Sequence, residues 1–211
     1  MTGEPRPTRH IVVMGVSGAG KTTVARGISE LTGLRFAEAD EFHPAANVAR
    51  MRAGIPLDDA DRWPWLRDLA SWMAARHTEG VSTVLACSAL KRSYRDVLRQ
   101  GPPDVEFVLL NGSAELIRDR MTRRTDHYMS AGLLDSQRAI LEHLGPEESG
   151  MVLEVALSPD ELVAAVVARL GLPPATPATH PATGHSGRRA RPGLRQPGDA
   201  STWARSGDAP G

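Results

Sequence analysis

The stretch Gly15-Val16-Ser17-Gly18-Ala19-Gly20-Lys21-Thr22 decides the fold of this 211-residue chain. It follows the apolar run Ile11–Met14 and precedes a segment of helical patterning, so the order is strand, glycine loop, helix. Glycines let backbone N–H groups turn inward around phosphate oxygens, and a helix N-terminus adds positive partial charge at the same point. The sequence therefore predicts a loop that binds a nucleoside triphosphate.

The residue types in this loop have separate tasks. We expect the backbone amides of residues 16–22 to bind phosphate oxygens, and Lys21 to reach the β- and γ-phosphates. The hydroxyl of Thr22 is a ligand for Mg²⁺, so ATP and Mg²⁺ are the predicted cofactors. The predicted ATP-binding residues here are Gly15, Val16, Ser17, Gly18, Ala19, Gly20, Lys21, Thr22 and Thr23.

Composition limits the kind of protein and its partners. The formal net charge is 0, so no overall field attracts nucleic acid or an anionic membrane. The first apolar run is too short for a signal peptide or a membrane span. Cys87 is the one cysteine, so no intramolecular disulfide forms, as in a reducing compartment. We expect a cytoplasmic protein that binds neither nucleic acid nor membrane.

The composition changes after Leu172. Residues 173–211 contain seven prolines and six glycines and few large apolar side chains. Such a segment buries too little surface to offset the entropy of ordering it. The sequence predicts a folded domain over residues 8–172 and a disordered tail over 173–211. An alternative for the tail is an electrostatic tether, since its arginines outnumber its aspartates.

Strand-like and helix-like runs alternate within the domain. Expected strands cover residues 11–14, 35–39, 81–87, 105–110 and 151–157, and expected helices cover 22–31, 45–53, 62–77, 94–99, 114–124, 136–143 and 159–170. This alternation predicts an α/β fold with a parallel sheet and helices on both faces. Ligands of such sheets lie beyond the carboxyl ends of the strands.

Polar residues follow the second expected strand. Asp40 comes about 20 residues after the phosphate loop, where a carboxylate could orient an attacking hydroxyl or accept its proton. It could instead bind Mg²⁺ through water. His43 lies three residues further on. The alternative is that Asp40 and His43 only form a turn and a cap before the helix at residue 45.

Cations near the next elements suit an anionic acceptor. Arg62 stands among three aspartates at a helix start, and helix capping accounts for an aspartate there but not for the arginine. Lys91 and Arg95 follow the third strand with Arg92 between them. Arg120 and Arg124 share one helix face, and the polar segment 125–134 after them is typical of a mobile lid. A solvated charged face is the alternative for these two arginines.

Together these segments resemble the small gluconokinases, P-loop kinases related to shikimate and adenylate kinases. The matching pieces are MGVSGAGKTTV (14–24), DEFHP (40–44), GIPLDDADRWPWL (54–66), CSALKRSYRDVLR (87–99) and RMTRRTDHYM (120–129). The resemblance covers residues 9–172 in one register. The sequence departs from the family pattern at Glu38-Ala39, where Asp-Gly is frequent, and at Thr125-Asp126, where the lid carries an acid.

The resemblance implies transfer of the γ-phosphoryl group of ATP to the 6-hydroxyl of D-gluconate by a cytoplasmic homodimer. It implies a three-layer P-loop kinase fold with a five-stranded parallel sheet, a substrate-binding segment and a lid. Lys21, Asp40 and Arg124 would be catalytic. The gluconate-binding residues would be Asp40, His43, Arg62, Lys91 and Arg95, and Arg120 would stack on adenine or clamp phosphate.

Two other functions remain open at this point. A P-loop kinase of this size could act on shikimate or another small polyhydroxy acid. A slowly hydrolysing nucleotide-dependent switch is a second class, although the sequence lacks a long apolar strand ending in a lone aspartate. A kinase that modifies nucleic acid is disfavoured by the near-neutral charge of the domain.

Overall fold

The computed structural model describes residues 7–122 and 131–175. The chain divides into two units, residues 1–177 and 178–211, and all described residues belong to the first. The described chain still packs beyond the predicted boundary at residue 172, because the Ala175 amide donates a hydrogen bond of 2.8 Å to the Leu31 carbonyl. The predicted tail lies outside the described residues from position 176 onward.

Five strands form one parallel sheet. They are β1 (His10–Met14), β2 (Arg35–Glu38), β3 (Thr83–Ala86), β4 (Val105–Asn111) and β5 (Gly150–Glu154). Their order in the sheet is β2-β3-β1-β4-β5, and every neighbouring pair is parallel. All five residues of central β1 are buried, as expected for a continuous apolar run in a parallel sheet. The predicted α/β fold with a five-stranded parallel sheet is confirmed.

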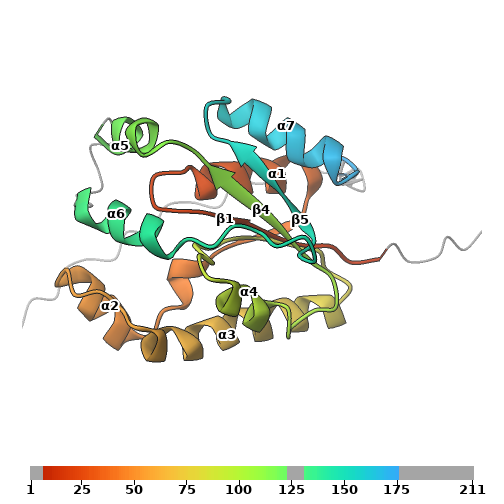
Figure 1. Ribbon diagram of the computed structural model, residues 1–211. Coiled ribbons are helices and arrows are strands. Elements are labelled where there is room, and N and C mark those ends of the chain that lie inside the picture. The colour runs from red at the N-terminus through yellow and green to blue at the C-terminus, as the bar shows by residue number, and fades with distance from the viewer. Residues whose placement is uncertain (1–6, 123–130, 176–211) are drawn as a thin grey trace, which may run out of the picture. The chain divides into compact units, whose positions relative to one another are not determined.

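Helices cover both faces of this sheet (Figure 1). They are α1 (Lys21–Thr32), α2 (Ala45–Arg52), α3 (Asp59–Thr78), α4 (Arg92–Leu98), α5 (Ala114–Thr122), α6 (Ala131–Ile140) and α7 (Pro159–Arg169), with a 3₁₀ turn η1 (Ala39–Phe42) after β2. Alternate residues of β1 point to opposite faces. Ile11 and Val13 join the core beneath α1 and α7, whereas Val12 and Met14 join the core over α3 and α4.

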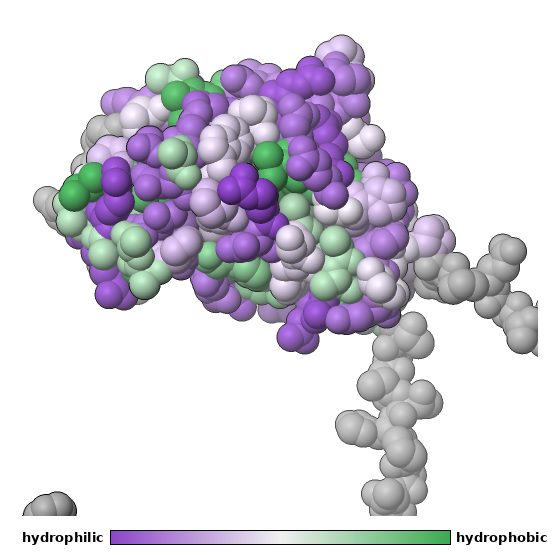
Figure 2. Space-filling model, turned by 90° about the horizontal axis from the view of Figure 1, so that it is seen from below, coloured by the Kyte–Doolittle hydropathy of each residue, from purple (hydrophilic) through white to green (hydrophobic). Residues whose placement is uncertain are grey.

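Helix α3 shows how local sequence sets one of these layers. Asp58 and Asp61 form a capping box, since each side chain accepts a hydrogen bond from the other residue's backbone amide. The helix buries Trp65, Leu66 and Leu69 against the sheet. On the side of α3 and α4 the molecular surface is largely hydrophilic, with smaller apolar areas between (Figure 2). The apolar residues of α3 therefore face the core, as their helical spacing predicted.

Several element boundaries differ from the sequence prediction. Helix α3 begins at Asp59 rather than at residue 62, because Asp58 is its N-cap. Helix α6 begins at Ala131 rather than at residue 136, so part of the predicted lid-like segment is helical. Leu134 is buried in the core, and this anchoring outweighs the low helix propensity of Gly132. Strand β5 ends at Glu154 rather than at residue 157. The chain leaves the ladder there, after the Val155 amide donates a hydrogen bond of 2.7 Å to the Asn111 carbonyl.

Candidate active site

Three segments meet at the carboxyl ends of neighbouring strands. The glycine loop follows β1, η1 follows β2, and residues 87–91 follow β3. The Gly15 amide donates a hydrogen bond of 3.2 Å to the Ser88 carbonyl, which ties the first segment to the third. The indole of Trp65 donates a bond of 2.7 Å to the Ala39 carbonyl, which ties α3 to η1. This edge of the sheet is where parallel α/β folds bind ligands.

The glycine loop has the backbone geometry that phosphate binding needs. Gly20, at the N-terminus of α1, has φ +96°, a value that L side chains rarely adopt. A Cβ atom at Gly15 would lie 2.7 Å from the Leu110 carbonyl oxygen, so only glycine fits there. The Lys21 ammonium donates to the Val16 carbonyl at 3.1 Å, across the loop. The side-chain oxygen of Gln137, on α6, accepts from the Ser17 amide at 2.6 Å.

Glu38 also belongs to the candidate site. From the sequence, it was visible only as a difference from the family's frequent Asp-Gly. The Thr22 hydroxyl donates a hydrogen bond of 2.7 Å to a Glu38 carboxylate oxygen. Burial raises the pKa of Glu38, and the neighbouring Asp40 raises it further, whereas the Thr22 hydroxyl and Lys21 oppose the shift. Mg²⁺ in kinases takes one or two protein oxygens and completes its shell with water and phosphate. Thr22 and Glu38 fit such an ion.

Asp40 and His43 lie in and just after η1. His43 stacks on Trp65, with 4.3 Å between ring centroids and 16° between ring planes. Burial lowers the pKa of His43, and Arg62 lowers it too, whereas Asp40 acts in the opposite direction. The Nδ1 atom of His43 is buried and has no hydrogen-bond partner within residues 7–122 and 131–175. Asp40 and Arg62 thus both lie near the His43 imidazole.

Lys91 and Arg62 converge on a carboxylate that sequence reasoning did not assign to the site. The Lys91 ammonium donates to both oxygens of Asp59, at 3.0 and 2.8 Å. The Tyr94 hydroxyl accepts from the Arg62 guanidinium at 3.1 Å and donates to Asp59 at 2.5 Å. Asp59 is next to the aspartates that cap α3, so the sequence alone does not distinguish it from a capping residue. Only the packing of α3 against α4 brings the four groups together.

The prediction that Arg95 binds the acceptor is wrong. Its side chain is fully buried. Its guanidinium donates twice to Glu148, at 2.7 Å each, and also to the Ala89 and Leu90 carbonyls. Ala89 has φ +42°, which is unusual for a residue other than glycine. Arg95 therefore stabilises the turn that precedes Lys91 and does not face an acceptor.

Arg120 and Arg124 differ in what the structure describes of them. Arg120, on α5, donates to the carbonyls of Val155 and Leu157 in the loop between β5 and α7. These bonds attach α5 to that loop, and the role of Arg120 toward adenine or phosphate stays a prediction. Arg124 and most of the predicted lid fall within residues 123–130, outside the described residues.

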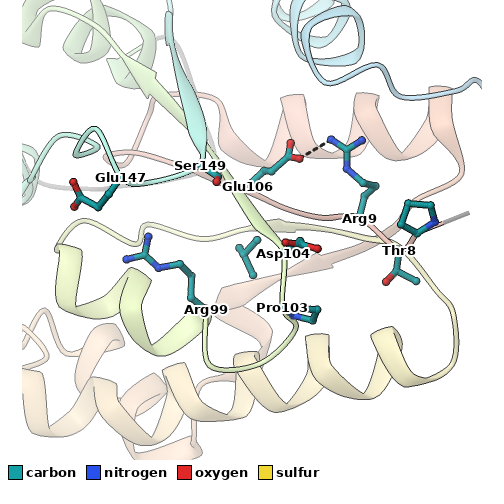
Figure 3. A pocket seen from close by; sticks show the side chains of 10 residues that line it. Thr8, Arg9, Arg99, Pro103, Asp104, Glu106, Glu147 and Ser149 are labelled. Carbon is teal, nitrogen blue, oxygen red and sulfur yellow. Dashed lines mark hydrogen bonds and ion pairs between the residues drawn. The ribbon is translucent and has the colours of Figure 1, made fainter.

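A separate cavity lies at the opposite ends of the strands (Figure 3). Its volume is about 310 Å³, and its lining includes Thr8 and Arg9 before β1, Glu106 in β4 and Ser149 before β5. The Arg9 guanidinium pairs with Glu106 at 2.6 Å, so these two charges neutralise each other. None of the predicted site residues lines this cavity. The carboxyl-end cluster is therefore the candidate active site.

The fold and this cluster define a class. A glycine loop at the N-terminus of α1, facing carboxylates and cations across the carboxyl ends of a parallel sheet, is the architecture of a P-loop kinase. A scan against protein-family models found no match. The chain is 50% identical to the gluconokinase of Gluconobacter oxydans over 140 residues, which cover 66% of this chain and 79% of that protein.

Solved structures agree with this relationship. A sugar kinase from Janibacter sp. HTCC2649 is 58% identical, with a TM-score of 0.76, over 79% of this chain and 96% of the other. A gluconokinase from Sinorhizobium meliloti is 43% identical, with a TM-score of 0.70, over 79% and 95%. The chain belongs to the gluconokinase family. Within the part of the chain that the structure describes, no helix is long and apolar enough to cross a membrane.

Proposed function

We propose that this protein transfers the γ-phosphoryl group of ATP to the 6-hydroxyl of D-gluconate. The observation that carries the proposal is that the Gly15–Ser88 hydrogen bond ties the phosphate loop to the segment leading to Lys91, while Asp40 and Arg62 both lie near His43. A sugar acid carries one carboxylate and several hydroxyls, which suit ammonium and guanidinium donors. The names of the relatives, which include gluconokinases, support the same substrate.

The donor half of the site would bind ATP through the loop. The backbone amides of residues 16–22 would surround the phosphates, and Lys21 would leave the Val16 carbonyl to reach the β- and γ-phosphates. Thr22 and Glu38 would hold Mg²⁺, the threonine directly and the glutamate through water. When bound, this ion neutralises charge on the phosphate oxygens. Arg120 would border the adenine, and Arg124 would stabilise the transferring group from the lid.

The acceptor half would position the 6-hydroxyl for in-line attack. Asp40 would orient this hydroxyl or accept its proton, since it lies beside both Glu38 and His43. His43, Arg62 and Lys91 would bind the other hydroxyls and the carboxylate. Phosphoryl transfer leaves little covalent work to a protein, so positioning and electrostatics account for most of the rate. We also propose a cytoplasmic homodimer, as the family resemblance implies.

Coupled measurement of ADP release tests the assignment. The reaction is run with D-gluconate, shikimate, nucleoside monophosphates, and no acceptor, each with and without Mg²⁺. Strong stimulation by gluconate alone, dependent on Mg²⁺, is the expected result. Stimulation by another acceptor with gluconate silent would overturn the substrate, and equal ADP release without any acceptor would indicate a nucleotide switch. Sedimentation velocity tests the homodimer separately.

A further inference from the structure

Asp59 is the common partner of three side chains in the acceptor half of the site. Its carboxylate accepts two hydrogen bonds from the Lys91 ammonium and one from the Tyr94 hydroxyl. The Arg62 guanidinium lies 3.6 Å from the same carboxylate. Helix capping does not explain these contacts, because Asp58 and Asp61 form the capping box of α3 between themselves. The Asp59 carboxylate therefore has a different task.

These contacts determine where the cations point. Arg62 donates to Tyr94 and Tyr94 donates to Asp59, so a chain of polarised hydrogen bonds connects the guanidinium with the carboxylate. Lys91 donates to both oxygens of Asp59, and these two bonds fix the direction of its ammonium group. Its pairing with Asp59 raises the pKa of Lys91, and the Lys91 and Tyr94 hydrogen bonds lower the pKa of Asp59. Both partners thus stay charged at neutral pH.

The carboxylate also lowers the local positive charge. Lys91 and Arg62 are two cations, and with Asp59 these three side chains carry a net charge of +1. All three side chains are partly exposed, at 27%, 25% and 42%, so water screens the charge itself. A lysine without its partner would instead have to give up side-chain rotamer freedom each time an acceptor binds. Orientation therefore matters more here than the count of charges.

We propose that Asp59 is a positioning residue that holds Lys91, Tyr94 and Arg62 in the arrangement that recognises the acceptor's carboxylate. This inference rests on the proposed function, because it concerns the acceptor of the same kinase reaction. Asp59 touches neither the phosphate loop nor Asp40 in any described contact, so its effect belongs to acceptor binding and not to phosphoryl transfer. A substitution of Asp59 should therefore change the KM for the acceptor, whereas substitutions of the catalytic residues should change kcat.

The substitution Asp59→Asn tests the proposal. Asparagine keeps the size of the side chain and one acceptor oxygen but removes the charge and the second acceptor for Lys91. We expect the KM for D-gluconate to rise about tenfold, with kcat and the KM for ATP within about threefold of wild type. Asp59→Glu restores the charge on a longer side chain, and its KM for gluconate should fall between those of wild type and Asp59→Asn.

The neighbouring aspartate supplies a matched control. Asp58→Asn keeps an efficient N-cap, so its KM for gluconate should equal that of wild type. Thermal unfolding of all three variants shows whether each one folds. An unchanged KM for gluconate in Asp59→Asn, or equal losses for gluconate and ATP, overturns the proposal. A lower KM also overturns it, since Asp59 would then compete with the acceptor's carboxylate.

The proposed function is tested apart from this comparison. Wild-type protein must release ADP in response to gluconate. If it does not, gluconate is not the substrate, and the role of Asp59 is measured with a different acceptor. The same KM ratio between wild type and Asp59→Asn is then determined with whichever anionic acceptor stimulates the wild type. An unchanged ratio with that acceptor overturns the role of Asp59 itself.

Discussion

At the scale of single residues, cationic side chains have different roles in this protein, and the surroundings of each side chain decide its role. Lys91 is partly exposed and pairs with Asp59, whereas Arg95, four positions later, is buried against Glu148. Lys21 lies on the phosphate loop and donates to a loop carbonyl. Charge alone therefore says little about role, and each assignment needs a variant that separates activity from folding.

Lys21→Ala tests the phosphate loop. We expect kcat to fall on the order of a thousandfold or more, because this ammonium is the positive charge proposed to reach the transferring phosphoryl group. The unfolding temperature should stay within a few degrees of wild type. Arg26→Ala is the control on the same helix, since Arg26 stacks over the Phe36 ring at 4.3 Å. Near-normal turnover in Lys21→Ala would refute the kinase assignment of the loop.

Glu38→Gln tests the metal ligand that the sequence left in doubt. The amide still accepts a hydrogen bond from Thr22 but carries no charge for the hydrated ion. We expect the Mg²⁺ concentration for half-maximal activity to rise about tenfold, a typical effect of losing an outer-sphere partner. Titrating Mg²⁺ at fixed ATP measures it. Glu41→Gln, an exposed neighbour, should not change the titration, and a matching shift there would argue for a general loss of negative charge.

At the scale of elements, α4 connects the acceptor segment with the loop before β5. Its buried Arg95 joins Glu148 to the Ala89–Leu90 turn, and the Glu142 and His143 carbonyls accept from the same guanidinium. Glu148 also accepts from the Gly145 amide. These bonds hold the pKa of Glu148 down to about 2, with Arg95 as the main cause. Arg95 therefore connects the Ala89–Leu90 turn with the chain before β5 through its hydrogen bonds.

Arg95→Met tests this structural role. Methionine fills similar volume but leaves the buried Glu148 without its main charge partner, with Arg99 still 3.5 Å away. Breaking a buried pair costs about 3–5 kcal/mol. Urea unfolding measures the loss. The depressed pKa of Glu148 gives a second readout. In wild type, the Arg95–Glu148 pair's contribution to the free energy of unfolding should be lost only as pH falls from about 4.5 to about 2. The variant should lack this acid-dependent loss. If only the KM for gluconate changed and the free energy of unfolding did not, Arg95 would bind the acceptor after all.

At the scale of the whole molecule, every proposed site residue that the structure describes belongs to one unit, residues 1–177. The two cores of this unit lie on opposite faces of the sheet, and the loops that form the site extend from one edge of it. The last described residues still belong to this packing. Leu172 is 5% exposed, and its amide donates to the Val167 carbonyl at 3.0 Å.

Two truncations locate the end of the folded unit. A chain ending at Pro177 should keep kcat/KM within about twofold and unfold within a few degrees of wild type. A chain ending at Gly171 loses the buried Leu172 and the Ala175–Leu31 hydrogen bond, at a cost of about 2–3 kcal/mol, or several degrees. Calorimetry compares them. Equal unfolding temperatures for both chains would place the boundary before residue 172.

The sequence by itself determined the parts of this protein that are local in the chain. The loop 15–22 with its strand and helix, and the alternation that makes a parallel sheet, each depend on neighbouring residues, so their pattern is visible without a structure. Only tertiary structure decided that Glu38 meets Thr22, that Asp59 organises Lys91 and Arg62, and that Arg95 is structural. Burial and pairing arise where separate elements pack together, and one-dimensional spacing does not contain that information.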